Sequence, residues 1–150
     1  MSEAVIIYGA DGRPIKVQAL GSRSREAVRN DPVAARAIDA FVSNCIGSGI
    51  KPLPVVDDED LRREILDAWQ EWCYEADADG RADFYGLQSL AVRAMREGGE
   101  CFVRFRPRRP QDGFSIPLQI QLLEAEFCDA LKDSALPTGN IVRSGVEFDR

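Results

Sequence analysis

The sequence predicts an α+β fold, with about three amphipathic helices packed on a small, mainly antiparallel sheet. Three stretches with apolar residues three and four positions apart, at 32–46, 58–74 and 84–97, indicate the helices. Two alternating stretches, 101–106 and 116–122, indicate paired strands. Hydrophobic residues make up 45% of the 150 residues, and no apolar run approaches the roughly 18 residues that span a bilayer. These features favour a globular chain without a membrane partner.

The N-terminal residues predict a β-hairpin. Residues 4–8 and 14–18 flank the turn sequence Gly-Ala-Asp-Gly-Arg. A linker rich in serine and arginine is expected at 21–25, followed by a short helical stretch. We therefore divide the chain into a hairpin and linker over 1–21 and an α+β region over 22–150.

The first of the three helices is marked at both ends. Pro32 suits the first helical position because it has no N–H that would lack a partner, and Asn30 or Asp31 suits the N-cap. Gly47 and Gly49 are expected to end the helix. The apolar face consists of Ala34, Ala37, Ile38, Phe41, Val42 and Cys45.

Aspartates predict the starts of the next two helices. Asp57 or Asp58 caps the second helix, whose acidic first turn suits the positive end of the helix dipole. Asp83 caps the third helix, and Gly98 and Gly99 end it. The expected core faces are Leu61, Ile65, Ala68, Trp69 and Trp72 in one helix and Leu87, Leu90, Ala91, Ala94 and Met95 in the other. The tryptophans are either a ligand platform or core residues, and helical spacing favours the core.

The last third of the chain predicts strands. The loop 107–115 joins the two alternating stretches named above. Further strands are expected at 140–143 and 146–148.

Charge is unevenly distributed. Residues 57–83 contain eleven acidic residues and three arginines, a net charge of −8, whereas the whole chain carries −6. An acidic chain binds nucleic-acid phosphates poorly, although it can surround DNA without gripping it. Four arginines stand out, and they are the candidate contact with a neighbouring subunit or with DNA: Arg104, Arg106, Arg108 and Arg109. The alternative is a solvated strand face and loop tip.

The residue content argues against catalysis. The chain has no histidine, which removes the commonest general base and the usual partner of a serine or cysteine nucleophile. We therefore predict that the chain is not an enzyme and holds no cofactor. The four cysteines (Cys45, Cys73, Cys101 and Cys128) are too far apart in sequence to indicate a zinc site, and all are expected to be buried, reduced thiols.

Residues 75–86 partly match a calcium-binding loop. With Glu75 as the first ligand, acidic residues occupy positions 1, 3, 5 and 9, and glycine occupies position 6. Position 12, which supplies the bidentate glutamate, is Gly86, and position 8 is Ala82. We therefore expect weak calcium binding or none, and no metal site.

Five motifs occur in the order found in one protein family. Together they resemble lambda-type bacteriophage portal proteins, which are head–tail connectors, over about residues 22–150. The motifs are Arg29–Ala37 running into Gly47–Pro52, Asp77–Gln88, Gly99–Arg108, Pro117–Glu124, and Gly145–Asp149.

The resemblance implies a structural, ring-forming subunit at the phage head vertex. DNA is packaged and ejected through such a ring, without sequence recognition, and the tail attaches to it. The implied partners are identical subunits, terminase, capsid and tail-adaptor proteins, and double-stranded DNA. The implied location is the virion, after assembly in the bacterial cytoplasm.

Within that family, this sequence corresponds to the N-terminal, wing-like region. The channel-lining segments of the family lie further along the chain, so we expect the sequence to be truncated at its C-terminus and to self-associate heterogeneously. The alternative function is a small acidic, calcium-dependent binding or adaptor module.

Overall fold

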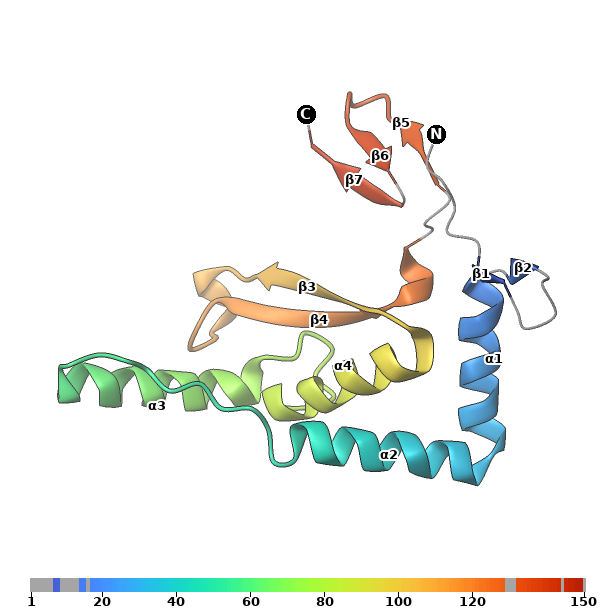
Figure 1. Cartoon of the computed structure of the whole chain (residues 1–150). Helices are drawn as coiled ribbons and strands as arrows, with labels where there is room; N and C mark the ends of the chain where they lie inside the picture. The colour runs from blue at the N-terminus through green and yellow to red at the C-terminus, as the bar shows by residue number, and fades with distance from the viewer. Residues whose placement is uncertain (1–6, 9–13, 16, 129–131, 144, 150) are drawn as a thin grey trace.

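The computed structural model describes residues 7–8, 14–15, 17–128, 132–143 and 145–149 and confirms the α+β fold (Figure 1). The helices are α1 (Val17–Asn30), α2 (Pro32–Ile46), α3 (Glu59–Glu75) and α4 (Phe84–Gly98), with short 3-10 turns η1 (Pro110–Asp112) and η2 (Ala125–Phe127). The strands are β1 (Ile7–Tyr8), β2 (Pro14–Ile15), β3 (Cys101–Pro107), β4 (Leu118–Glu124), β5 (Ser134–Ala135), β6 (Ile141–Arg143) and β7 (Val146–Phe148).

The N-terminal part differs from the prediction in one respect. The predicted linker at 21–25 is wrong, because these residues lie inside α1. Gly21 lies close to the main-chain oxygen of Gly98 at the end of α4, so tertiary packing stabilises a helix that local composition does not favour. The hairpin is seen as the antiparallel pair β1–β2, and residues 4–6, 9–13 and 16 of the predicted hairpin lie outside the described residues.

The predicted strand pair is present as β3 and β4. The two strands are antiparallel, and Phe105 lies opposite Ile120. The second strand begins at Leu118, because the Leu118 N–H is bonded to the Ile116 carbonyl in a tight turn before it. The described strands form three separate antiparallel sheets, β1–β2, β3–β4 and β5–β6–β7. The strands predicted near 140–143 and 146–148 are therefore confirmed, whereas the short β5 was not predicted.

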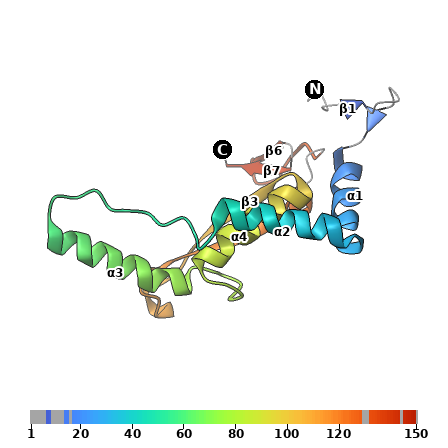
Figure 2. The same ribbon diagram turned by 60° about the horizontal axis from the view of Figure 1, so that its bottom comes forward.

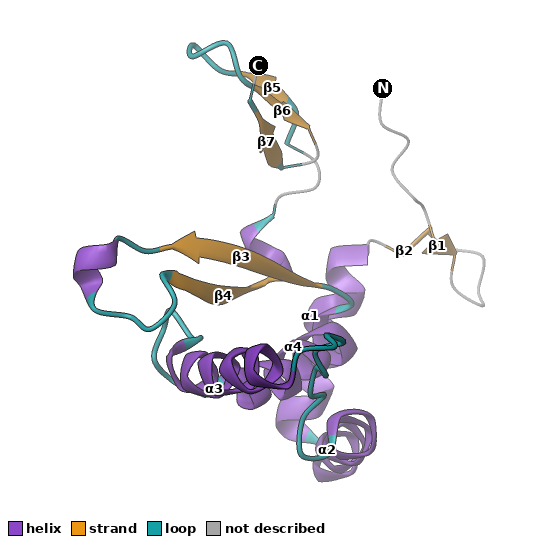
Figure 3. Ribbon diagram, turned by 90° about the vertical axis from the view of Figure 1, so that its left-hand side faces the viewer, coloured by secondary structure: helices purple, strands orange, loops and turns teal. Residues whose placement is uncertain are grey.

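The layers place the β3–β4 pair over two helices. Figure 3 shows this pair above α3 and α4, whereas α2 packs on the other side of α4 and α1 stands upright at the end of the helical layer (Figure 1). The core lies where α3 and α4 meet β4 and consists of Trp72, Cys73, Ala76, Leu87 and Ile120. The ring centroids of Trp69 and Trp72 lie 5.1 and 5.2 Å from that of Phe84. The interpretation of the tryptophans as core residues is therefore confirmed.

Several predicted core positions are instead exposed. Leu61 is 44% and Ile65 39% exposed, because the N-terminal half of α3 projects beyond the sheet. The coil at 47–58 runs out to the far end of α3, which then leads back to the core (Figure 2). Leu90 and Met95 of α4 are also exposed, and no residue of α2 is buried. The apolar spacing predicted these helices correctly but overestimated how much of each face is covered.

Candidate interaction surfaces

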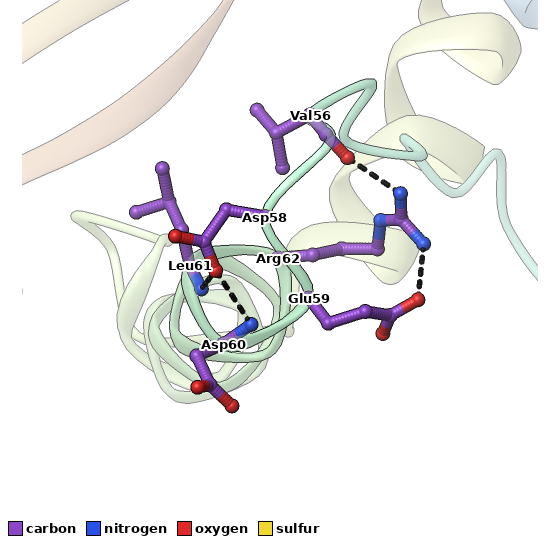
Figure 4. Close-up of polar contacts among 6 residues, drawn as sticks. All are labelled: Val56, Asp58, Glu59, Asp60, Leu61 and Arg62. Atoms are coloured by element: carbon purple, nitrogen blue, oxygen red, sulfur yellow. Dashed lines mark hydrogen bonds and ion pairs between the residues drawn. The ribbon is translucent and has the colours of Figure 1, made fainter.

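The projecting end of α3 is fixed by its N-cap. The Asp58 carboxylate accepts hydrogen bonds from the amides of Asp60 and Leu61, at 2.9 and 3.1 Å (Figure 4). A carboxylate in this place satisfies two amides that have no partner in the helix, and its charge matches the helix dipole. Asp58 therefore holds the first turn of α3.

Arg62 ties the same turn to the preceding coil. Its guanidinium donates to the main-chain oxygen of Val56 and to the Glu59 carboxylate, 3.0 Å away (Figure 4). Asp60 lies 3.7 Å from Arg63. The acidic residues of the first turn are therefore occupied by contacts within the N-terminal end of α3.

Three acidic residues further along α3 have no such partner. Glu64, Asp67 and Glu71 are exposed and recur at intervals of three and four, so they share one side of the helix. Within the described residues, none of the three forms an ion pair or a side-chain hydrogen bond. We call these residues the acidic stripe. Like charges at this spacing repel one another by a few tenths of a kcal/mol per pair.

Arg104 and Arg106 lie together on β3. They are two residues apart in a strand, so their side chains point to the same face, and they are paired with Gln121 and Gln119 of β4. Ile120 faces the helical core from the opposite face. Arg104 and Arg106 therefore occupy the face of the sheet opposite Ile120, where Arg104 is exposed and Arg106 is half-buried. We call these two residues the basic face.

The other two arginines of the run are placed differently. Arg108 Nε donates to Oε1 of Gln119 at 2.8 Å, and its guanidinium lies 5.9 Å from the Phe114 ring centroid. Arg109 follows the strand, and its main-chain N–H donates to the Asp112 carboxylate at 3.0 Å. The structure thus groups Arg104 with Arg106, holds Arg108 within the fold, and places Arg109 at the turn η1.

The acidic loop after α3 is organised by Asp77, a buried residue. Its carboxylate accepts hydrogen bonds from the amides of Asp79, Arg81 and Ala82 at 2.8 to 3.1 Å. From the sequence, this carboxylate was considered only as a possible calcium ligand, and no structural role was predicted for it. The spacing Asp-x-Asp-Gly, which also suits an aspartate turn, was the signal for the structural role.

The remaining carboxylates of the loop point to other partners. Glu75 accepts from the amide and hydroxyl of Ser115, both at 2.9 Å, and Asp79 accepts from Gln121. Asp83 caps α4 by accepting from the Gly86 amide at 2.7 Å. Across the described residues, no group of three or more histidine, cysteine, aspartate or glutamate side chains is close enough to hold a metal ion.

A pocket of about 220 Å³ lies between α4, β4 and Arg25 of α1. Two of its lining arginines form ion pairs: Arg25 with Glu126, and Arg93 with Asp39 and Glu97. The hydrogen bond to Glu97 raises the pKa of Arg93, and the Asp39 carboxylate acts in the same direction. Three arginines and five carboxylates line the pocket, so it does not favour an anionic ligand.

The cysteines are not all buried, which corrects the prediction. Cys73 is buried in the core, Cys101 and Cys128 are partly exposed, and Cys45 is exposed on α2. Burial raises the pKa of the Cys73 thiol above its ordinary value. The prediction failed for Cys45 because the described residues cover the apolar side of α2 only in part.

Comparison with known proteins identifies the family. In the described part of the chain, no helix is long and apolar enough to cross a membrane. A family model described as "Phage portal protein, lambda family" matches residues 11–150, which is nearly the whole chain. The chain belongs to this family. The resemblance drawn from the ordered motifs is therefore confirmed.

A curated relative supports the same family. The chain is 31% identical over 142 residues to a "Probable portal protein" of Halomonas phage phiHAP-1. The match covers 88% of this chain and 27% of the relative. The chain thus spans about a quarter of the length of the curated portal relative that it matches.

Proposed function

We propose that this chain forms part of a portal ring subunit at the vertex of a phage head. DNA is packaged and ejected through the ring, and the tail attaches to it. The observation that carries the proposal is the match of residues 11–150 to the lambda portal family. We further propose that residues 22–150 form the wing-like outer region, that the first 21 residues contribute the hairpin before it, and that α1, which spans this boundary, joins the two.

The charge distribution supports a structural role beside DNA. The net charge of −6 makes tight binding of this segment to phosphates unfavourable. We propose that DNA passes through the ring without sequence recognition. The proposed partners are identical subunits, terminase, capsid and tail-adaptor proteins. Assembly takes place in the host cytoplasm, and the protein itself performs no catalysis.

The proposal is tested with the full-length portal protein that carries this segment. A phage lacking the portal gene is complemented either with the intact gene or with one from which residues 59–98, covering α3 and α4, are deleted. Heads are purified, treated with nuclease and assayed for protected DNA. We expect protected DNA only with the intact gene. Filled heads in the absence of the intact protein contradict the proposal.

Electron microscopy of the purified full-length protein provides the second arm of the test. We expect closed rings with a central channel. A protein that stays monomeric at every concentration and salt condition contradicts the ring.

A further inference from the structure

We propose that one copy of this chain binds the next through the acidic stripe of α3 and the basic face of β3. The acidic stripe (Glu64, Asp67 and Glu71) of one subunit contacts Arg104 and Arg106 of its neighbour. This proposal rests on the proposed function and specifies the contact between adjacent subunits.

The two surfaces lie on opposite sides of the molecule. The core residues Trp72 and Ala76 face β4, and the acidic stripe lies on the other side of α3. The basic face belongs to the side of the sheet opposite Ile120, which packs on the helical core. Figure 3 shows the sheet above the helices in this two-layer arrangement. The stripe therefore cannot reach the basic face of its own chain.

Opposite charges on opposite sides favour head-to-tail association. Each copy presents the stripe to one neighbour and the basic face to the other, which is a heterologous contact. Such contacts close into rings when the rotation between copies allows it. A two-fold dimer uses the same patch on both copies. Because the stripe and the basic face lie on opposite sides, such a dimer would place stripe against stripe or basic face against basic face, where like charges repel.

The dimensions of the two surfaces are compatible. Glu64 and Glu71 are seven residues apart on a helix, about 10 Å. Arg104 and Arg106 are about 7 Å apart along a strand, and their long side chains extend the reach. The planar guanidinium matches a carboxylate through two parallel hydrogen bonds.

An exposed aromatic side chain adjoins the stripe. Tyr74 lies one turn beyond Glu71 on α3 and is 72% exposed. An arginine guanidinium stacks favourably on an aromatic ring. Tyr74 therefore adds a second kind of arginine contact at the core end of the stripe.

A DNA phosphate is the competing ligand for the arginines. It would satisfy Arg104 and Arg106 but leave the repulsion within the acidic stripe unrelieved. A neighbouring copy satisfies both surfaces at once, so the observations favour it.

The test uses charge reversal in the full-length portal protein. One variant reverses the stripe (Glu64→Lys, Asp67→Lys and Glu71→Lys), and the other reverses the basic face (Arg104→Glu and Arg106→Glu). The control for the basic-face variant is Arg29→Glu with Arg36→Glu, which makes the same charge change at exposed positions of α1 and α2. Assembly is measured by mass photometry and electron microscopy, and folding by circular dichroism.

We expect each reversal alone to lower the assembled fraction roughly tenfold or more, with the control unchanged. Mixing the two variants restores rings, because each copy then meets a complementary surface on both sides. Combining both reversals in one chain restores rings as well. This rescue also shows that each variant is folded.

Other outcomes overturn the proposal. Rings that are unaffected by either reversal refute this contact but leave the portal function intact. Loss of DNA packaging with the arginine reversal, and no rescue by the reversed stripe, assigns the arginines to DNA instead. If the unaltered full-length protein forms no ring, the proposed function itself fails.

Discussion

The indole N–H of Trp72 donates a hydrogen bond to the main-chain oxygen of Leu118, 2.6 Å away. This bond joins the end of α3 to the start of β4 across 46 positions of sequence. Trp72 is 7% exposed, so the Leu118 oxygen has little access to water as a substitute. The contact therefore fixes the helical layer against the strand pair.

Replacing Trp72 with phenylalanine should lower the free energy of unfolding by about 2–4 kcal/mol. This loss of stability has two contributions: the missing hydrogen bond to Leu118, and the cavity left because phenylalanine is smaller than tryptophan. Trp69→Phe is the matched control. The Trp69 N–H is 3.4 Å from the Tyr85 hydroxyl, so this substitution removes a weaker hydrogen bond. Urea unfolding followed by circular dichroism measures both variants. Equal effects of the two substitutions would show that the Leu118 bond contributes nothing specific.

Asp77→Ala should destabilise the chain by about 2–4 kcal/mol. The substitution leaves three amides without their acceptor in a loop that pairs with β4. Asp79→Ala, which removes one exposed bond to Gln121, should cost less than about 1 kcal/mol. Thermal unfolding of both variants provides the measurement. A mild effect at Asp77 would mean that the loop keeps its shape without the carboxylate.

Local chemistry allowed most elements to be predicted from the sequence. Asp31, Asp58 and Asp83 each accept a main-chain hydrogen bond at the start of their helix, as the capping pattern predicts. Alternation predicted the β3–β4 pair because a strand displays its side chains with a period of two. Caps and periodicity act within a few residues, which is the range that a sequence pattern describes.

The missed features depend on contacts between distant residues. The helix α1 is stabilised by packing on α2 and α4 rather than by its own serines and arginines. Alternation places Arg104 and Arg106 on one face, but it does not show that Arg108 is bonded to Gln119. Apolar spacing likewise predicts which side of α2 is hydrophobic without showing what covers it.

Gly49→Ala should destabilise the chain more than Gly80→Ala. Both glycines have positive φ angles, of 103° and 65°, which cost an alanine about 1 kcal/mol or more. An added Cβ at Gly49 would also lie 2.2 Å from the Tyr85 ring, whereas nothing lies within 4 Å of one at Gly80. We expect a difference of at least about 1 kcal/mol in denaturant unfolding. Equal stability of the two variants would show that the close approach of Tyr85 to Gly49 adds no cost.

The cysteines should react with a thiol reagent in the order of their exposure. Cys45 reacts first because it is exposed, and Cys73 reacts last because it is buried. The raised pKa of Cys73 lowers its thiolate fraction at a given pH, so its reactivity rises only at more alkaline pH or on unfolding. Mass spectrometry of timed labelling reactions resolves each site. Early labelling of Cys73 in the folded chain would contradict its burial in the core.

Calcium should bind the loop at 75–86 weakly or not at all. The bidentate ligand expected at position 12 is replaced by Gly86, and the Asp77 oxygens already accept three amides. Filling the site would require these bonds to break, so the affinity should fall below that of calcium sensors.

Calcium at one hundred times its Kd would stabilise the folded chain by about 2.7 kcal/mol, a shift of several degrees in Tm. We expect no such shift at millimolar calcium and little heat in titration calorimetry, with magnesium as the matched control. A micromolar Kd for calcium would instead favour the alternative function, a calcium-dependent binding module.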